Sequence, residues 1–270
     1  MIPENFIQQW RAQAPWQMLS MVEHDLVISR ALVDLFQNKL VAESLVFRGG
    51  TALNKLYLNP PARYSEDIDL VQMEPTPIGP VLDAIRDSLS WLGEPKRKLT
   101  ERSAKLIYKY TTFEGEPAKL KIEINTTEHF HVHPLQSFPF EVISEWYEGH
   151  GDVKTYTLEE LMATKLKALY QRRKGRDLFD WWHMLTQELV DISTTLSLFE
   201  KYCQHEGETV TRALFEKNMT LKRTHKDFCL DMHPLLPVDF PWDFEEAYDL
   251  VLRDLIPRLP GEPWKGEKIL

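Results

Sequence analysis

Two aspartates, Asp67 and Asp69, lie one residue apart in a stretch, residues 67–72, whose Ile, Leu and Val residues predict a strand. Residues two apart on a strand project from the same face, so the two carboxylates lie side by side. They repel each other unless a cation lies between them. A hard divalent ion such as Mg²⁺ takes oxygen ligands of this kind and leaves positions open for phosphate oxygens. The spacing therefore predicts a metal site at these two aspartates.

A pair of glycines precedes the aspartates in the chain. Residues 45–47 form a short apolar run that ends at Gly49 and Gly50, and Thr51 is placed to cap a short helix over residues 52–57. Glycines between a strand and a helix let backbone N–H groups approach an anion, and the helix N-terminus adds a favourable dipole. This arrangement predicts a phosphate-binding turn beside the metal site.

A third acid, Glu123, lies in a second predicted strand, where it shares a face with Lys121 and Asn125. If this strand adjoins the strand of Asp67 and Asp69, three carboxylates converge. Such a group can bind a metal ion and deprotonate an attacking hydroxyl. The alternative is a solvent-facing glutamate paired with a lysine, and the sequence leaves both interpretations open.

Lys165 lies within the apolar stripe of a predicted helix, whose other members are Leu158, Leu161, Met162, Ala168 and Leu169. Its side chain is therefore expected to face the protein body, where it needs an anionic partner. A nucleotide phosphate is one such partner, and a salt bridge to a structural acid is the alternative. Further along the chain, Asp177 and Asp180 lie three residues apart and share a helix face. Asp177 is equally explained as a first-turn acid favoured by the helix dipole.

The predicted secondary structure that positions these residues changes from mixed strands and helices to helices near residue 155. Before it, strands and helices mix around one sheet, which predicts an α/β or α+β plan. After it, the pattern is helical. The boundary predicts a first domain over residues 1–155 and a second, helical domain over residues 156–270. The expected helical regions are 4–38, 52–57, 78–92, 158–172, 176–189, 191–205 and 209–219, and the other expected strands are 105–113 and 119–126, joined as a hairpin.

Charge and composition narrow the classes of function. The net charge of −9 argues against a protein that coats nucleic acid. Two stretches, residues 96–109 and 163–176, are nevertheless basic, which suits a site that holds phosphates, although two solvated faces would give the same pattern. The chain starts without the pattern of a signal peptide, has no apolar run long enough to span a membrane, and contains two cysteines. These features predict a cytoplasmic location and no membrane partner.

Four blocks of the sequence, in order, resemble the AbiEii/AbiGii group of nucleotidyltransferase toxins, which includes the abortive-infection AbiE toxins and the mycobacterial MenT toxins. The resemblance implies a DNA polymerase β-like nucleotidyltransferase fold with a mixed sheet, followed by a helical domain. It also implies an NTP site with Mg²⁺ or Mn²⁺ in the cleft between these domains. The blocks are Gly49-Gly50-Thr51 with Asn54-Lys55, Ser65-Glu66-Asp67-Ile68-Asp69, Ala163–Leu169 around Lys165, and Arg176-Asp177-Leu178-Phe179-Asp180.

The resemblance also assigns roles to residues of this chain. Asp67 and Asp69, with Glu123 added from its strand pattern, are expected to hold the metal and take part in catalysis. Lys165 is expected to bind phosphate, and either Asp177 or Asp180 to supply a further catalytic acid. The residues expected to contact the nucleotide are Gly49, Gly50, Thr51, Asn54, Lys55, Ser65 and Lys165.

Family members act as growth-inhibiting toxins opposed by an antitoxin, and some add nucleotides to the 3′ end of tRNA. The chain is thus expected to transfer NMP from an NTP to RNA, with a tRNA 3′ end as acceptor and an antitoxin as partner. One alternative keeps this chemistry but uses a small-molecule or protein hydroxyl, and the basic stretches favour RNA over it. Another is a non-catalytic nucleotide-binding interaction module, which the set of acids and Lys165 argues against.

Overall fold

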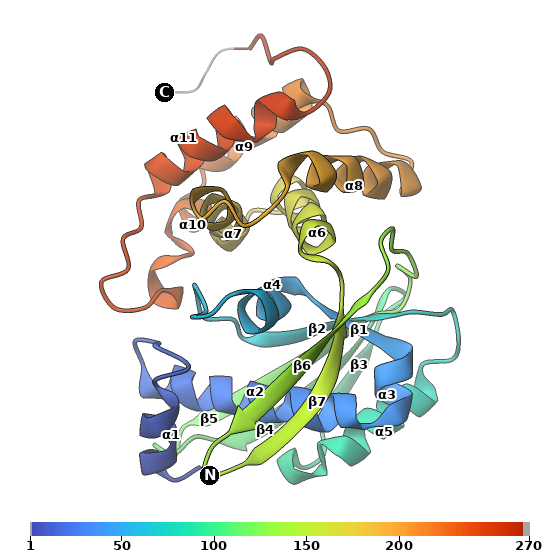
Figure 1. Ribbon diagram of the computed structural model, residues 1–270, viewed down its shortest axis with the longest axis vertical. Coiled ribbons are helices and arrows are strands. Elements are labelled where there is room, and N and C mark those ends of the chain that lie inside the picture. The colour runs from blue at the N-terminus through green and yellow to red at the C-terminus, as the bar shows by residue number, and fades with distance from the viewer. Residues whose placement is uncertain (1, 267–270) are drawn as a thin grey trace. The chain divides into compact units, whose positions relative to one another are not determined.

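The computed structural model describes residues 2–266 and divides into two compact units (Figure 1). The first unit comprises Met1–Thr157 with the short segment Leu236–Val238, and the second comprises Leu158–Leu235 and Asp239–Leu270. The sequence pattern does not indicate that residues 236–238 belong to the first unit. Among residues 2–266, no helix is long and apolar enough to cross a membrane.

The first unit is built on a seven-stranded sheet with the order β3-β4-β5-β2-β1-β7-β6. The pairs β1–β7 and β2–β5 are parallel and the other neighbours are antiparallel. The expected α/β class with a mixed sheet is therefore confirmed. The strands are β1 (Leu45–Arg48), β2 (Asp67–Gln72), β3 (Lys96–Leu99), β4 (Ser103–Thr111), β5 (Pro117–Asn125), β6 (Gln136–Ile143) and β7 (Glu148–Thr155).

Alternating side chains give this sheet an apolar face and a polar face. On β5, Leu120, Ile122 and Ile124 are fully buried, whereas Lys121 and Glu123 are partly exposed. The long helix α2 (Leu19–Gln37) packs on the sheet, with most of its side chains buried. Each fully buried aliphatic side chain contributes about 1.5–3 kcal/mol, so this packing keeps the apolar face covered and leaves the other for polar residues. The remaining helices of the unit are α1 (Glu4–Trp10), α3 (Lys39–Ser44), α4 (Gly49–Ala52), the π-helix η1 (Leu53–Tyr57), α5 (Gly79–Ser88) and the 3₁₀ helix η2 (Ser90–Leu92).

Three strands have no clear sequence signal. β3 and β6 are the two edges of the sheet, where one side of the strand lacks a partner and burial does not impose alternation. Lysine in β3 and Pro139 in β6 are typical of edge strands. β7 contains Gly149 and Gly151, which weaken the pattern of a strand that pairs on both sides. The predicted helical region 4–38 also differs from the structure, where it forms two helices, α1 and α2.

The second unit is helical, as expected. In α6 (Leu158–Gln171), the side chains of Leu161, Met162, Leu166 and Leu169 are fully buried and form one face of the core. The other helices of the unit are α7 (Gly175–Thr186), α8 (Ile192–His205), α9 (Arg212–Arg223), α10 (Lys226–Leu230), η3 (His233–Leu235), α11 (Phe244–Asp254) and η4 (Ile256–Arg258).

Candidate active site

The glycine turn is packed directly against the second aspartate. Gly49 follows β1 with a backbone φ of +83°, a left-handed conformation that disfavours side chains. A Cβ atom at this position would lie 2.6 Å from Asp69 Oδ2. The turn therefore requires glycine both for its backbone angle and for the close approach of the carboxylate.

The next glycine packs against a buried arginine, Arg63, for which the sequence pattern predicts no role. A Cβ atom at Gly50 would lie 2.5 Å from Arg63 Nη2 and 3.2 Å from Ser65 Oγ. Arg63 is 1% exposed, and its Nη1 donates to the carbonyl of Tyr64 at 3.1 Å. The arginine stands two residues before Ser65 in the chain, which is the one sequence signal that could have drawn attention to it. It places a buried positive charge at the turn.

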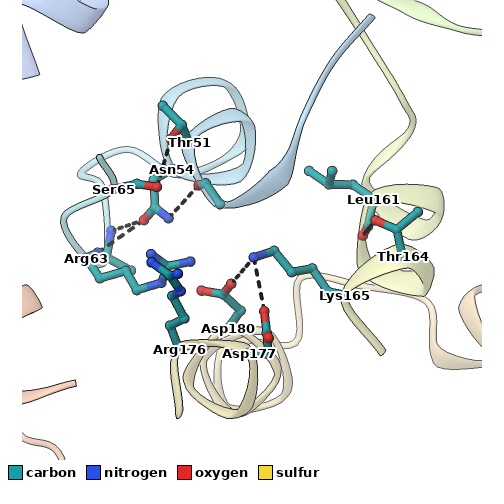
Figure 2. A network of polar contacts seen from close by, with 12 residues as sticks. Thr51, Asn54, Arg63, Ser65, Leu161, Thr164, Lys165, Arg176, Asp177 and Asp180 are labelled. Carbon is teal, nitrogen blue, oxygen red and sulfur yellow. Dashed lines mark hydrogen bonds and ion pairs between the residues drawn. The ribbon is translucent and has the colours of Figure 1, made fainter. Parts of the chain in front are cut away.

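Thr51 ties the turn to the aspartate strand and does not cap a helix. Helix α4 begins at Gly49, with Arg48 as its N-cap, so the expected start at residue 52 is wrong. The Thr51 hydroxyl lies 2.8 Å from Ser65 Oγ and 2.5 Å from the carbonyl oxygen of Asp67. These contacts place Thr51 and Ser65 together beside the start of β2 (Figure 2).

Asn54 and Lys55 have partners within the first unit, which changes their expected role. Asn54 is buried; its amide nitrogen donates to Gly50 O at 2.9 Å, and its carbonyl oxygen accepts from the backbone N–H groups of residues 62 and 63 (Figure 2). Lys55 Nζ lies 2.6 Å from Asp25 Oδ1 and 2.9 Å from Ser29 Oγ, both on α2. These contacts hold the turn in place and fix Lys55 to α2, and the predicted contact of the two side chains with nucleotide stays a prediction.

Strand pairing brings the expected acids onto one sheet face. Asp67 lies opposite Lys121 and Asp69 opposite Glu123 in the parallel pair β2–β5. The predicted placement of Glu123 on a strand adjoining the aspartates is therefore confirmed. Two lysines contact these acids, with Lys121 Nζ 2.7 Å from Asp67 Oδ2 and 3.5 Å from Glu123 Oε2, and Lys105 Nζ 2.7 Å from Glu123 Oε1.

The pKa values of Asp69 and Glu123 are shifted in opposite directions. Burial, followed by repulsion from Asp67, raises the pKa of Asp69 above its ordinary value. Burial also acts to raise the pKa of Glu123, but the hydrogen bond and charge of Lys105, with Lys121, outweigh it and lower the pKa overall. Glu123 is thus a stable anion and a weak base, whereas the charges of Arg48 and Lys121 do not offset the effect of burial and of Asp67 on the pKa of Asp69.

A divalent ion fits Asp67 and Asp69 but not the expected set of three carboxylates. Among residues 2–266, no three His, Cys, Asp or Glu side chains are arranged to hold a metal ion, so the predicted convergence of Glu123 with the two aspartates is corrected. The physical reason is that Lys105 holds the Glu123 carboxylate at 2.7 Å, whereas Lys121 lies closer to Asp67, at 2.7 Å, than to Glu123, at 3.5 Å. The aspartate pair offers hard oxygen donors, and Asp69 has room only because residue 49 has no Cβ.

In the second unit, Lys165 is the centre of a buried ionic cluster. It is 4% exposed, so the prediction that it faces inward is confirmed. Its Nζ lies 2.7 Å from Asp180 Oδ2 and 3.5 Å from Asp177 Oδ1, both on α7 (Figure 2). The salt bridge to an acid, which the sequence left as the alternative to a phosphate, is thus present in the structure.

The two aspartates of this cluster differ in their partners. Asp177 binds Arg172 through both oxygens, with Oδ2 2.7 Å from Arg172 Nε and Oδ1 2.9 Å from Nη2. Burial acts to raise the pKa of Asp177, but Lys165 and Arg172 outweigh it and lower the pKa. This two-point contact is the strong geometry for an arginine and a carboxylate, and it fixes the Asp177 side chain beside Lys165.

Comparisons with known proteins identify a family and a similar fold. Residues 30–250 match the family model described as "Nucleotidyl transferase AbiEii toxin, Type IV TA system". The fold is similar to that of MenT4, a nucleotidyltransferase toxin from Mycobacterium tuberculosis, with a TM-score of 0.63 and 19% identity over 96% of this chain and 91% of that chain. A nucleotidyltransferase-like antigenic protein from Paracoccidioides brasiliensis matches with a TM-score of 0.37 and 17% identity over 63% of this chain and 76% of that chain. The sequence matches no curated protein sequence.

Proposed function

This chain belongs to the AbiEii family of nucleotidyltransferase toxins of type IV toxin–antitoxin systems, and we propose that it transfers NMP from an NTP to the 3′ end of an RNA, specifically a tRNA. In this reaction the acceptor hydroxyl oxygen forms a bond to the α-phosphorus of the NTP. The bond from that phosphorus to the β-phosphate oxygen breaks, and pyrophosphate leaves. The hydroxyl proton passes to a base. The observation that carries the proposal is the pair of aspartates on β2, of which Asp69 packs against a left-handed glycine turn.

We propose that Asp67 and Asp69 hold Mg²⁺, or Mn²⁺ in its place. When bound, the ion would neutralise charge on the triphosphate. The raised pKa of Asp69 supports this role, because nearby cations offset the burial of this half-exposed carboxylate less fully than they offset that of Glu123. Glu123 contributes indirectly, by holding Lys105 and Lys121 beside the aspartates.

The proposed nucleotide-binding set consists of the glycine turn and the two hydroxyl side chains that lie beside it. We propose that Gly49, Gly50, Thr51 and Ser65 contact the triphosphate, with the buried charge of Arg63 at the turn favouring an anion there. A turn that leads from a strand into a helix presents backbone N–H groups to an anion. Asn54 and Lys55 support this turn through their bonds to the Gly50 carbonyl and to Asp25.

In the second unit, we propose that Lys165 binds phosphate and that Asp180 is the acid that acts with it. A lysine ammonium has three donor hydrogens and can bind a carboxylate and a phosphate together. Asp177, held at two points by Arg172, serves to position Lys165. We also propose a cytoplasmic location, since Cys203 and Cys229 are both free thiols, and a protein antitoxin as partner, as the family description implies.

The test is a transfer assay with each labelled NTP, Mg²⁺ and purified tRNA. Wild-type protein is expected to label the tRNA, and a chelator is expected to stop the reaction. Asp67→Asn and Asp69→Asn should each reduce the rate by about 100-fold or more, the order of loss found when a group that stabilises developing charge is removed. Asp83→Asn is the matched control, because Asp83 lies on the exposed side of α5 and pairs only with a surface arginine among its described contacts.

The possible outcomes test the metal site and the choice of acceptor separately. Labelling that persists in both aspartate variants, or that is unaffected by the chelator, would contradict the proposed metal site. Labelling of a small molecule or a protein with no labelling of RNA would contradict the proposed acceptor.

A further inference from the structure

The strands next to the aspartates carry an unusual local charge. Strands β3, β4 and β5 contain seven Lys and Arg residues and one acid, Glu123, within a chain whose net charge is −9. Six of the seven are lysines that strand register places on the same sheet face as Asp67, Asp69 and Glu123. They are Lys96, Lys98, Lys105, Lys109, Lys119 and Lys121.

The register arranges these lysines in rows that lead to the aspartates. One row runs across four strands from Lys98 through Lys105 and Glu123 to Asp69. The next row runs from Lys96 through Ile107 and Lys121 to Asp67. Neighbouring strands lie about 4.8 Å apart, so each row spans about 14 Å from the edge strand to the aspartate strand.

Four of the six lysines have charges that the fold does not use. Lys105 and Lys121 are neutralised by Glu123 and Asp67. Lys96, Lys98, Lys109 and Lys119 are exposed, and no ion pair to them is found within residues 2–266. We refer to these four as the lysine surface.

The lysine surface includes two like charges in direct opposition, because Lys109 lies opposite Lys119. Like charges directly across a strand pair are destabilising, so the fold gains nothing from this pair. The two lysines lie in the part of the β4–β5 hairpin beyond the residues that pair with β3 and β2. Lys98 lies opposite Lys105, whose charge Glu123 already balances. A bound polyanion would offset the repulsion between Lys109 and Lys119.

We propose that the lysine surface binds the phosphodiester backbone of the RNA acceptor and leads its 3′ end toward Asp67 and Asp69. This inference rests on the proposed function and adds the surface on which the acceptor lies. The partner is a polyanion with regularly spaced phosphates, which matches rows of lysines better than a single compact anion does. Lysine contacts to phosphate carry no base specificity, so the surface sets the register of the RNA and not its sequence.

The test measures RNA binding apart from catalysis. Binding of 5′-fluorescein-labelled tRNA is followed by fluorescence anisotropy over a series of salt concentrations, for wild type and for a variant with Lys96, Lys98, Lys109 and Lys119 all changed to Gln. The variant is expected to bind at least tenfold more weakly at low salt. The slope of log K against log salt concentration should fall by about 3, since each lost phosphate contact removes about 0.7–0.9. The KM for tRNA should rise while kcat and the KM for NTP stay within about twofold of wild type.

A matched variant controls for the loss of four charges. It changes four other exposed lysines to Gln, Lys39, Lys201, Lys217 and Lys226, and should bind tRNA like wild type. Thermal unfolding of the first variant checks its fold, and its melting temperature is expected to equal or exceed that of wild type because a repulsive pair is removed.

The outcomes distinguish this surface from the proposed function. Wild-type affinity and salt slope in the first variant, or equal weakening in the matched control, would overturn the surface. Wild-type protein that fails to bind tRNA would overturn it as well. Transfer to tRNA with an unchanged KM in the first variant would leave the proposed function standing without this surface. Lysine-dependent binding without any transfer would leave the surface standing and overturn the proposed function.

Discussion

At the scale of single residues, the candidate site depends on two close contacts in which replacing either partner would disturb the other. One is Gly49 against Asp69, and the other is Lys165 against Asp180. In the first, a missing side chain lets a carboxylate approach the backbone. In the second, opposite charges are buried together, so each is tolerated only while the other is present.

Gly49→Ala is expected to damage both stability and transfer. The left-handed backbone costs a non-glycine residue about 1–2 kcal/mol, and the new Cβ atom would displace Asp69 Oδ2, which lies 2.6 Å from its position. Chemical denaturation and the transfer assay measure the two effects. Gly79→Ala is the matched control, because nothing lies within 4 Å of its Cβ position. It should be neutral or stabilise by about 0.4–1 kcal/mol. Equal behaviour of the two variants would show that the turn tolerates a side chain.

Lys165→Met is expected to lower the free energy of unfolding by about 3–5 kcal/mol, since it leaves the carboxylates of Asp177 and Asp180 buried without their shared cation. Loss of transfer in this variant alone therefore does not identify a phosphate ligand. Lys165→Arg keeps the charge and the fold but moves the donor atoms, so it should raise the KM for NTP while retaining most of the stability. A wild-type KM for the arginine variant would assign Lys165 a purely structural role.

At the scale of elements, helix α2 is fixed to the aspartate strand through a buried histidine. His24 Nε2 lies 2.9 Å from the carbonyl oxygen of Glu66, and Nδ1 lies 2.7 Å from the Tyr110 hydroxyl. A carbonyl oxygen can only accept, so Nε2 carries the hydrogen and Nδ1 accepts from the tyrosine. The neutral ring thus joins α2, β4 and the residue that precedes β2.

This contact predicts a loss of stability in mild acid. Burial lowers the pKa of His24 below its ordinary 6.5, and the nearby charges of Asp25 and Glu66 only partly oppose this. Below pH 6.5 the unfolded chain therefore binds a proton that the folded chain resists. The stabilising contribution is complete above pH 6.5 and falls by up to about 1.4 kcal/mol for each pH unit below it.

Denaturation at pH 7.5 and pH 5.5 measures this effect. Wild type should lose more stability between the two pH values than His24→Gln, which cannot take up a proton. The same loss in both proteins would show that other groups cause the acid sensitivity.

At the scale of the whole molecule, the charge is divided in a way that composition conceals. A chain with a net charge of −9 carries strands β3 to β5 with seven basic residues and one acid. A polyanion approaching the protein is repelled by the average charge and attracted by this one surface. The chain also crosses between its units more than once, because Leu236–Val238 belong with the first unit, where Gln17 donates to Leu236 O at 2.8 Å.

The sequence by itself determined the features that depend on local periodicity. The alternation of Asp67 and Asp69, the placement of Glu123 on a strand facing the same way, and the inward direction of Lys165 all follow from the repeat of a strand or a helix. The mixed α/β plan and the helical second half follow for the same reason. The family resemblance came from the same blocks, and the match over residues 30–250 confirms it.

Only the tertiary structure decided which side chains meet. Lys55 pairs with Asp25, thirty positions away in the chain, and Glu123 pairs with Lys105 across a strand pair, and neither contact leaves a mark in any local pattern. The edge strands β3 and β6 were not foreseen either, because a strand with one free side is not forced to alternate. The rows of lysines beside the aspartates likewise exist only in the register of four strands. A strand period sets the face on which a residue lies, whereas pairing between distant segments sets its neighbours, and pairing depends on the packing of the whole sheet.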